Sequence, residues 1–223
     1  MIPASNPRSP FERLELADWR RQIADLYGAI RRIASYDPEE AWRTWRDERE
    51  RLYVHHPQSP LAAEARRQFH ARVWTYDPGL RFELALVAEA SGEPEPAATL
   101  PVSTGGAVRL ARVGSIHVPF EAGPRTLGVY WLDNYAGGLI LPFLDATNGA
   151  ETYAAGRYLF DTAKGADLGG DSRLGTMVVD FNFAYHPSCA FDPRWACPLA
   201  PAENRLDVRV EAGERLTDPP PEL

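Results

Sequence analysis

The sequence is short of lysine and of cysteine. Only one of the 24 basic residues, Lys164, is a lysine, so Schiff-base chemistry has a single candidate amine, in a glycine-rich stretch that predicts an exposed loop. Two cysteines in 223 residues are too few for a disulfide-dense secreted scaffold. No apolar run approaches the roughly 20 residues that cross a bilayer, which argues against a membrane protein.

Positive charge is also in deficit. The chain has 31 acidic residues and a net charge of -7, which argues against a general nucleic-acid binder, because such a protein needs a basic face to displace counterions. The start of the chain lacks a charged segment followed by an apolar one, so no signal peptide is recognised and we expect a cytoplasmic protein. Dinucleotide, phosphate-loop, nucleophile-elbow and zinc-hydrolase motifs are absent from the sequence.

The first third of the chain is typical of helices. Apolar residues recur at spacings of three and four over residues 14–34, which predicts an amphipathic helix. Asp37 and Pro38 open a second helix to about residue 54, and Ser59-Pro60 opens a third to about residue 70. We therefore expect a flexible arm over residues 1–13 and a helical segment over residues 14–72.

The hydrophobic period changes from residue 73 onward. Short alternating runs recur about every 10 residues with turn residues between them, which is typical of antiparallel rather than βαβ sheets. The sequence predicts an α+β fold in which N-terminal helices pack on an antiparallel β-barrel or rolled β-sandwich. The β-rich core spans residues 73–216, with strands that include residues 157–160, 176–183 and 206–210, and residues 217–223 form a disordered tail with three prolines.

Polar residues between positions 141 and 205 are interleaved with glycines and aromatics. Three runs stand out: Pro-Phe-Leu-Asp-Ala-Thr to Gly-Arg-Tyr-Leu over residues 142–159, Asp-Phe-Asn-Phe-Ala-Tyr to Ser-Cys-Ala over 180–190, and Cys-Pro-Leu-Ala-Pro-Ala-Glu-Asn-Arg-Leu over 197–206. In these runs the chain resembles the bacterial and archaeal family known as domain of unknown function 1684, over roughly residues 42 to 215. The resemblance implies a shared fold unit and no particular activity.

Arg157 lies at the start of a predicted strand and is suited to hold an anion with two parallel hydrogen bonds. The functional interpretation is a pocket in which Arg157 binds a small anionic ligand. The alternative is a structural ion pair from Arg157 to Asp180 or Glu151 that fixes turns to the sheet. The hydrogen-bonding groups expected in the pocket are Asp180, Asn182, Glu151 and Tyr153.

His186, Cys189 and Cys197 lie within 12 positions and allow three interpretations. Thiolates and an imidazole suit zinc, although the gap between the cysteines is longer than in common structural zinc sites, and a fourth ligand would come from His117 or Glu203. A disulfide would close a short loop, which a reducing cytoplasm disfavours. Plain buried thiols are the third interpretation. A Cys–His nucleophile lacks an identified third group.

Three functional hypotheses follow from these residues. The first is a soluble protein that binds a small anionic molecule, as a binding protein or as an enzyme. The second is a structural or interaction module in which the helices at residues 14–34 and 38–54 form a homodimer or partner contact. The third is a zinc-supported site at Cys189 and Cys197. The sequence names no reaction.

Overall fold

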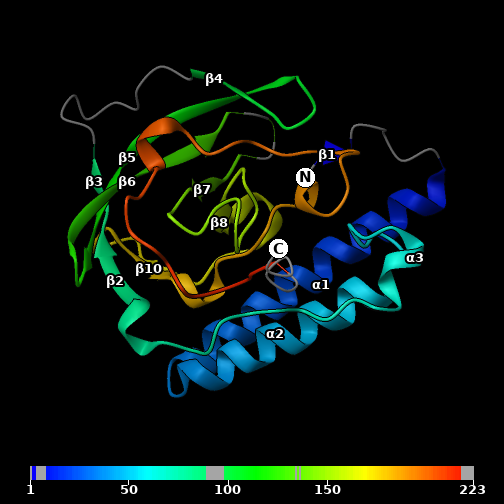
Figure 1. Ribbon diagram of the computed structural model, residues 1–223, viewed down its shortest axis with the longest axis horizontal. Helices are drawn as coiled ribbons and strands as arrows, with labels where there is room; N and C mark the ends of the chain where they lie inside the picture. The colour runs from blue at the N-terminus through cyan, green and yellow to red at the C-terminus, as the bar shows by residue number, and fades with distance from the viewer. Residues whose placement is uncertain (1, 4–8, 89–97, 134, 136, 217–223) are drawn as a thin grey trace, which may run out of the picture.

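The structure is a computed structural model that describes residues 2–3, 9–88, 98–133, 135 and 137–216. Helices lie along one side of the molecule and antiparallel sheets make up the other (Figure 1). The predicted α+β class with N-terminal helices is confirmed. The predicted tail at residues 217–223 and residues 1 and 4–8 of the predicted arm lie outside the described residues.

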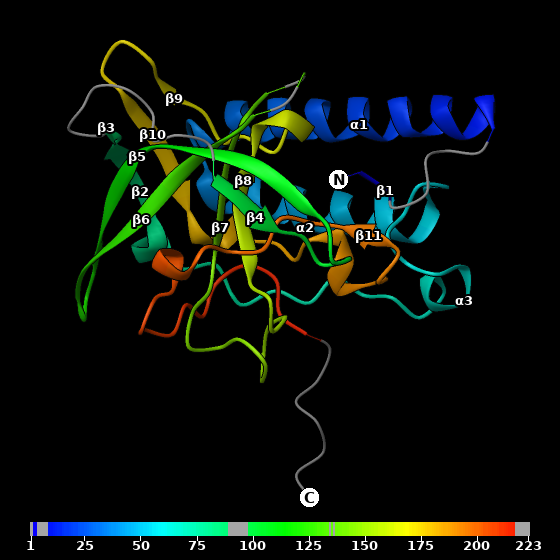
Figure 2. The ribbon, with the colours of Figure 1, turned by 90° about the horizontal axis from the view of Figure 1, so that it is seen from above.

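The helical side is built by α1 (Pro10–Ala34) and α2 (Pro38–His55), which lie side by side (Figure 2). α1 begins four residues earlier than expected because Ser9 caps it: the Ser9 hydroxyl accepts from the backbone of Glu12, and the Glu12 carboxylate accepts from the backbone of Ser9. No described helix is long and apolar enough to cross a membrane.

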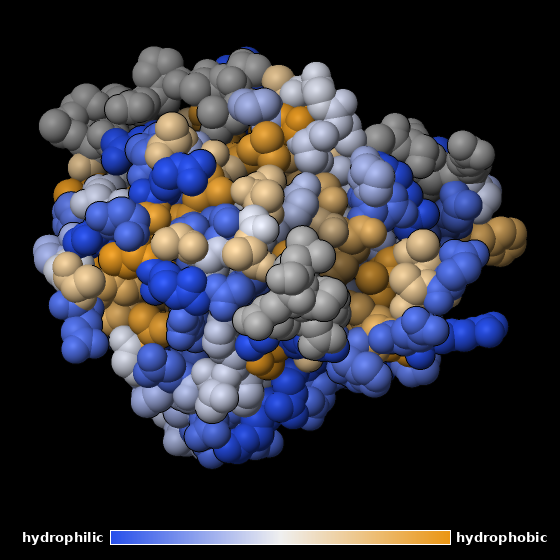
Figure 3. All heavy atoms as spheres, in the orientation of Figure 1, coloured by the Kyte–Doolittle hydropathy of each residue, from blue (hydrophilic) through white to orange (hydrophobic). Residues whose placement is uncertain are grey.

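The apolar faces of α1 and α2 pack against each other and against the β-rich part of the same chain. Charged side chains cover the lower edge of the molecule, where α2 lies (Figure 3). Phe183 of the β-rich part packs into the same cluster, with its ring 5.4 Å from that of Trp45. A homodimer through these helices stays a prediction. The buried residues include Trp19, Ile23, Tyr27 and Ile30 of α1 and Trp42, Trp45, Leu52 and Tyr53 of α2.

The third helix is much shorter than expected, since α3 (Ala63–Arg66) has only four residues. The Ser59 hydroxyl donates to the carbonyl of Tyr53, which ties this segment to the end of α2. The Arg66 side chain donates to the carbonyls of His56, Pro57 and Leu61. These side-chain bonds hold the backbone in a turn, where it cannot continue the helical ladder.

The largest sheet contains β3 (Val87–Ala88), β5 (Ala107–Phe120), β6 (Gly123–Leu132), β7 (Leu139–Phe143) and β8 (Arg157–Asp161) in that order, and β4 (Ala98–Pro101) also pairs with β5. A second sheet has the order β2 (Arg81–Ala85), β10 (Thr176–Asp180) and β9 (Gly170–Asp171). β1 (Ile2–Pro3) pairs with β11 (Trp195–Ala196). All of these pairings are antiparallel.

No closed barrel is found among the described strands. The outer strands of the large sheet, β3 and β8, do not pair with each other, and the strands of the second sheet, β2, β10 and β9, pair with neither of them. The two sheets still enclose one core, which includes residues from both. The barrel and the rolled sandwich therefore stay predictions beyond the confirmed antiparallel class. Fully buried members of this core are Ile116, Leu127, Leu141, Phe143, Val179 and Phe181.

Two predicted strands differ from the structure. The strand expected over residues 176–183 ends at Asp180, whose carboxylate accepts from the backbone of Asn182 and starts the 3-10 turn η3 (Phe181–Phe183). All three residues of η3 are buried, so the expected alternation of faces stops there. Residues 206–210 form no strand. Their backbone bonds go partly to side chains, as where Val210 donates to Asp145.

Candidate functional site

Arg157 begins β8 directly after a turn that requires glycine. Gly156 has a φ of 96°, and a Cβ atom there would lie 2.4 Å from the Phe143 carbonyl oxygen. The Arg157 side chain is fully buried and donates to the Asp145 carboxylate at 3.1 Å. Its terminal nitrogens also donate to three backbone carbonyls of the C-terminal segment, those of Val210, Ala212 and Glu214.

These contacts make Arg157 an anchor between β8, the turn at Asp145 and the C-terminal segment. The second carboxylate oxygen of Asp145 accepts from Thr147 and from the backbone of Val210, so both partners are held on several sides. Burial lowers the pKa of Arg157, and the charge of Asp145 opposes that shift. The terminal nitrogens of Arg157 face protein acceptors, which is the arrangement expected of a structural ion pair.

Asp180, Asn182 and Glu151 of the predicted pocket form hydrogen bonds and ion pairs with partners other than Arg157. Asp180 pairs with Arg81 at 3.0 Å, and Asn182 holds the backbone of Asp77 through two bonds of 2.8 Å. Glu151 pairs with Arg209 at the surface. The ion pairs expected between Arg157 and Asp180 or Glu151 are thus replaced by the pair with Asp145.

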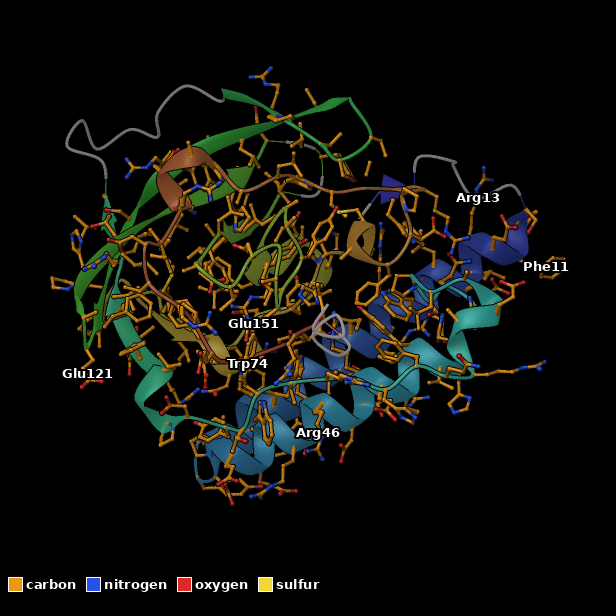
Figure 4. The ribbon with its side chains drawn as sticks, viewed as in Figure 1. Phe11, Arg13, Arg46, Trp74, Glu121 and Glu151 are labelled. Carbon is orange, nitrogen blue, oxygen red and sulfur yellow. The ribbon has the colours of Figure 1, made fainter. Side chains whose placement is uncertain are left out.

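Figure 4 shows Glu151 near Trp74, close to where the C-terminal segment passes. The Glu151 carbonyl accepts from the backbone of Leu216, and the Arg157 guanidinium lies 5.3 Å from the Trp74 ring centre. Glu121, in the turn between β5 and β6, lies at the far edge of the molecule. Besides Asp145, the surroundings of Arg157 therefore include the C-terminal segment and the rings of Trp74 and Phe143.

A second buried ion pair joins α2 to the C-terminal segment. Arg49 donates to both carboxylate oxygens of Glu214, and its guanidinium lies 4.5 Å from the Tyr53 ring centre and 4.9 Å from that of Tyr185. Burial raises the pKa of Glu214, but Arg49 outweighs it and the net pKa is lowered. Arg49 lies four residues from both Trp45 and Tyr53, so helical spacing places it on the buried face of α2. Arg49 is not among the residues predicted from the sequence, because the charged residues of this helix are expected on its exposed face.

His186 faces this ion pair. Its Nε2 accepts from the backbone of Tyr153 at 3.3 Å, and its Nδ1 lies 3.7 Å from Glu214. Burial lowers the pKa of His186 to about 4, so the ring is neutral at neutral pH, with its proton on Nδ1. Within the described ranges no group of three or more His, Cys, Asp or Glu side chains could hold a metal ion. The zinc site of His186, Cys189 and Cys197 stays a prediction, and the structure does not assemble its ligands.

The two cysteines form a compact cluster of their own. Cys189 lies in η4 (Ser188–Ala190), Cys197 directly follows β11, and both are free thiols that pack with Trp195 and Tyr153. The side chains of Cys197, Ser103 and Tyr153 interact with the Cys189 thiol and favour its charged form. The interaction with Cys197 lowers the pKa of Cys189 to about 6 against the effect of burial, and the pKa of Cys197 is raised.

Ser103, in the turn between β4 and β5, holds the cysteine segment in place. Its hydroxyl donates to the Trp195 carbonyl at 2.8 Å and accepts from the backbone of Cys197 at 3.1 Å. A hydroxyl has one proton, so Ser103 donates to Cys189 only when it turns away from that carbonyl. Ser103 therefore mainly fixes the position of the Cys197 backbone.

Lys164 lies near the thiols and is more buried than its sequence context predicts. Its side chain is 24% exposed, and its ammonium donates to Asp161 at 2.5 Å. Burial lowers the pKa of Lys164 to about 8, while Cys197 and Cys189 pull it up; burial also raises the pKa of Asp161 to about 7. The charge of Lys164 therefore acts on both thiols. Asp161 Oδ1 and the indole nitrogen of Trp195 are buried without a hydrogen-bond partner among the described residues.

Comparison with known proteins agrees with the resemblance carried by the sequence. Residues 68–215 match the family described as protein of unknown function DUF1684, a range that begins later than the sequence runs suggest and leaves α1 and α2 outside. No curated protein matches the chain.

The chain is also similar to the solution structure of an uncharacterized protein of Haloarcula marismortui. The two are 31% identical with a TM-score of 0.58, over 82% of this chain and 96% of that one. This chain belongs to the DUF1684 family of proteins of unknown function.

Proposed function

We propose that the protein performs reversible dithiol–disulfide chemistry at Cys189 and Cys197 and thereby reduces a small hydroperoxide. The observation that supports this proposal is the packing of two buried free thiols in one cluster, with the Tyr153 side chain against it and the charge of Lys164 acting on the thiols. Such a pair is suited to nucleophilic sulfur chemistry, because the thiolate is the reactive form and nearby donors and cations stabilise it.

The two thiols differ in a way that assigns their roles. Cys189 is 7% exposed and its pKa is lowered, whereas Cys197 is 2% exposed and its pKa is raised. Cys189 is therefore the attacking thiolate and Cys197 the resolving thiol. The low exposure of Cys189 favours a small oxidant over a protein disulfide, which would need a wider approach.

The reaction balances in two steps. The Cys189 thiolate attacks the terminal oxygen of the hydroperoxide, the O–O bond breaks, and the alkoxide leaves as an alcohol after taking a proton from Tyr153 or water. The Cys197 sulfur then attacks the sulfenic sulfur of Cys189, the S–O bond breaks, and the hydroxide leaves as water with the Cys197 proton. Two electrons pass from the thiols to the peroxide, and an external dithiol restores them.

The test treats the reduced full-length protein with one equivalent of hydrogen peroxide and follows the intact mass. We expect the loss of two hydrogen atoms and a cross-linked peptide pair containing Cys189 and Cys197. Cys197→Ser should stop at a sulfenic acid that dimedone traps, and Cys189→Ser should leave the peroxide unconsumed. The chain has no other cysteine, so each variant is a matched single-thiol control. Equal peroxide consumption by wild type and Cys189→Ser would contradict the proposal.

Arg157 does not support the hypothesis of a bound anionic ligand, because its terminal nitrogens donate hydrogen bonds to Asp145 and to backbone carbonyls. Lys164 is a cation whose charge acts on the thiols, and its described hydrogen bond goes to Asp161. An anionic substrate at the thiol pair would therefore depend on Lys164. Lys164→Met should slow a carboxylate-bearing hydroperoxide more than hydrogen peroxide.

A further inference from the structure

A cavity of about 270 Å³ lies apart from the thiol pair. It opens between the segment that follows α3, the turn that contains His186 and Phe191, and the C-terminal segment at residues 214–216. These three segments are far apart in the sequence, so the cavity exists only in the folded chain. We propose that this cavity binds a small aromatic carboxylate.

Aromatic and aliphatic side chains provide the apolar walls of the cavity. The rings of Phe69 and Phe191 meet edge to face with centres 6.0 Å apart, and Leu61 also lines the space. Phe191 further lies edge to face against the His186 ring at 6.1 Å. Ring edges and faces of this kind favour a planar aromatic guest, which can complete the same offset and edge-to-face packing.

The charge of the lining favours an anion. Arg72 and Arg215 both line the cavity. Arg215 stacks on the Trp74 ring at 5.6 Å, and within the described chain it has no carboxylate partner within 4 Å. The protein as a whole has a net charge of -7, so the positive charge of Arg215 at this cavity is a local departure from the overall charge. A guanidinium recognises a carboxylate through two parallel hydrogen bonds.

The one carboxylate in the lining does not oppose an anion. Glu214 is 3% exposed, and its oxygens accept from Arg49 and from the backbone of His186 at 2.7 Å. Its charge is thereby compensated from the protein side by Arg49, which does not itself line the cavity. The polar side of the cavity is consequently cationic at Arg215.

The volume of the cavity limits the size of the ligand. A cavity of roughly 150 Å³ holds a benzene molecule, so 270 Å³ accommodates about ten non-hydrogen atoms. That is the size of one aromatic ring with a carboxylate and a short side chain. Benzoate is the simplest probe of this class, and benzamide is its neutral counterpart of the same shape.

The experiment titrates benzoate and benzamide into the full-length protein and measures binding by calorimetry and by amide chemical shifts. We expect saturable benzoate binding at least about tenfold tighter than that of benzamide, because the charged contact to Arg215 is lost with the amide. Arg215→Gln should remove this preference, and Ala190→Leu, which adds bulk to the lining, should abolish binding. Arg67→Gln is the matched control, since Arg67 lies outside this cavity.

Absence of saturable benzoate binding to the wild-type protein would overturn the proposal. So would equal binding of benzoate and benzamide, or a loss in Arg67→Gln as large as that in Arg215→Gln. Should Ala190→Leu fail to fold, Arg215→Gln decides the question alone. Binding should persist when both cysteines are replaced by serine, so the result is independent of the proposed thiol chemistry.

Discussion

Arg157 and Cys189 are both polar, buried and part of the same β-rich region, yet their surroundings differ in kind. Four protein acceptors bind the terminal nitrogens of Arg157: the carboxylate of Asp145 and three backbone carbonyls. Around Cys189 the arrangement differs, because the side chains of Cys197, Ser103 and Tyr153 all favour the charged form of one sulfur atom. Fixed acceptors around a permanent cation stabilise one geometry, whereas donors around a thiol stabilise its reactive charged form.

Burial and charge alone therefore do not identify a functional site. Arg157 matches the sequence pattern of an anion clamp, but its partners leave it to connect three segments of the fold. The cysteines match no short motif, and their contact with Ser103, 94 positions away from Cys197, is visible only in the folded chain. The identity of the partners distinguishes an anchor from a reactive group.

The strongest test of the comparison removes the anchor. Arg157→Met leaves Asp145 and three carbonyls buried without their donor, so we expect the free energy of unfolding to fall by about 3–5 kcal/mol. Urea denaturation measures this change. A loss below about 1 kcal/mol would remove the anchor role and return Arg157 to the list of binding residues.

The next test uses the pH dependence of His186. The ordinary pKa of a histidine is 6.5, and that of His186 is about 4 in the folded state, so between these pH values the unfolded chain binds more protons. The free energy of unfolding is therefore highest above pH 6.5, and it decreases as the pH falls toward 4. A difference of 6.5 - 4 = 2.5 units corresponds to at most about 3 kcal/mol.

Asp161 acts in the opposite direction, because its folded pKa of about 7 exceeds its ordinary 3.8 and makes the fold more stable as the pH falls through that window. The His186 effect is therefore measured in an Asp161→Asn background. We compare unfolding free energies with and without His186→Asn at pH 7 and pH 5. Parallel pH profiles in the two proteins would contradict the assignment.

A smaller effect on stability and a larger one on reactivity are expected at the thiol cluster. Tyr153→Phe removes one donor to Cys189, so the pKa of Cys189 should rise and its alkylation at pH 7 should slow severalfold. The unfolding free energy should change by only about 1 kcal/mol. Iodoacetamide kinetics and urea denaturation on the same samples separate the two effects, and an unchanged alkylation rate would count against the cluster.

The smallest effect is expected at the surface. Arg209 pairs with Glu151, but its side chain is 49% exposed. Arg209→Met should change the unfolding free energy by less than about 1 kcal/mol, because exposed ion pairs contribute little. This variant is the matched control for Arg157→Met, and a comparable loss in both would show that burial does not distinguish the two pairs.

Local patterns predicted the elements whose bonds are local. The start of α2 follows from Asp37 and Pro38, because the Asp37 side chain accepts from the backbone of Glu40. The end of β10 could not be placed in this way, because Asp180 and Asn182 compete with the strand through side-chain hydrogen bonds.

The candidate sites depended on contacts that no local pattern contains. The acceptors of Arg157 at Val210, Ala212 and Glu214 belong to a segment predicted as a plain strand and its continuation. The neighbours of the cysteines come from the β4–β5 turn and from Lys164 in the turn after β8. Residue types identified candidate chemistry, but the long-range arrangement decided which side chains meet.

The rate of alkylation of the native reduced protein by iodoacetamide, followed from pH 5 to pH 9 and assigned to each cysteine by peptide mass, tests the central claim most directly. The account predicts that Cys189 reacts first, with a half-maximal rate near pH 6, while Cys197 stays unmodified. A midpoint near the ordinary thiol value of 9, or equal reaction of both cysteines, would contradict it.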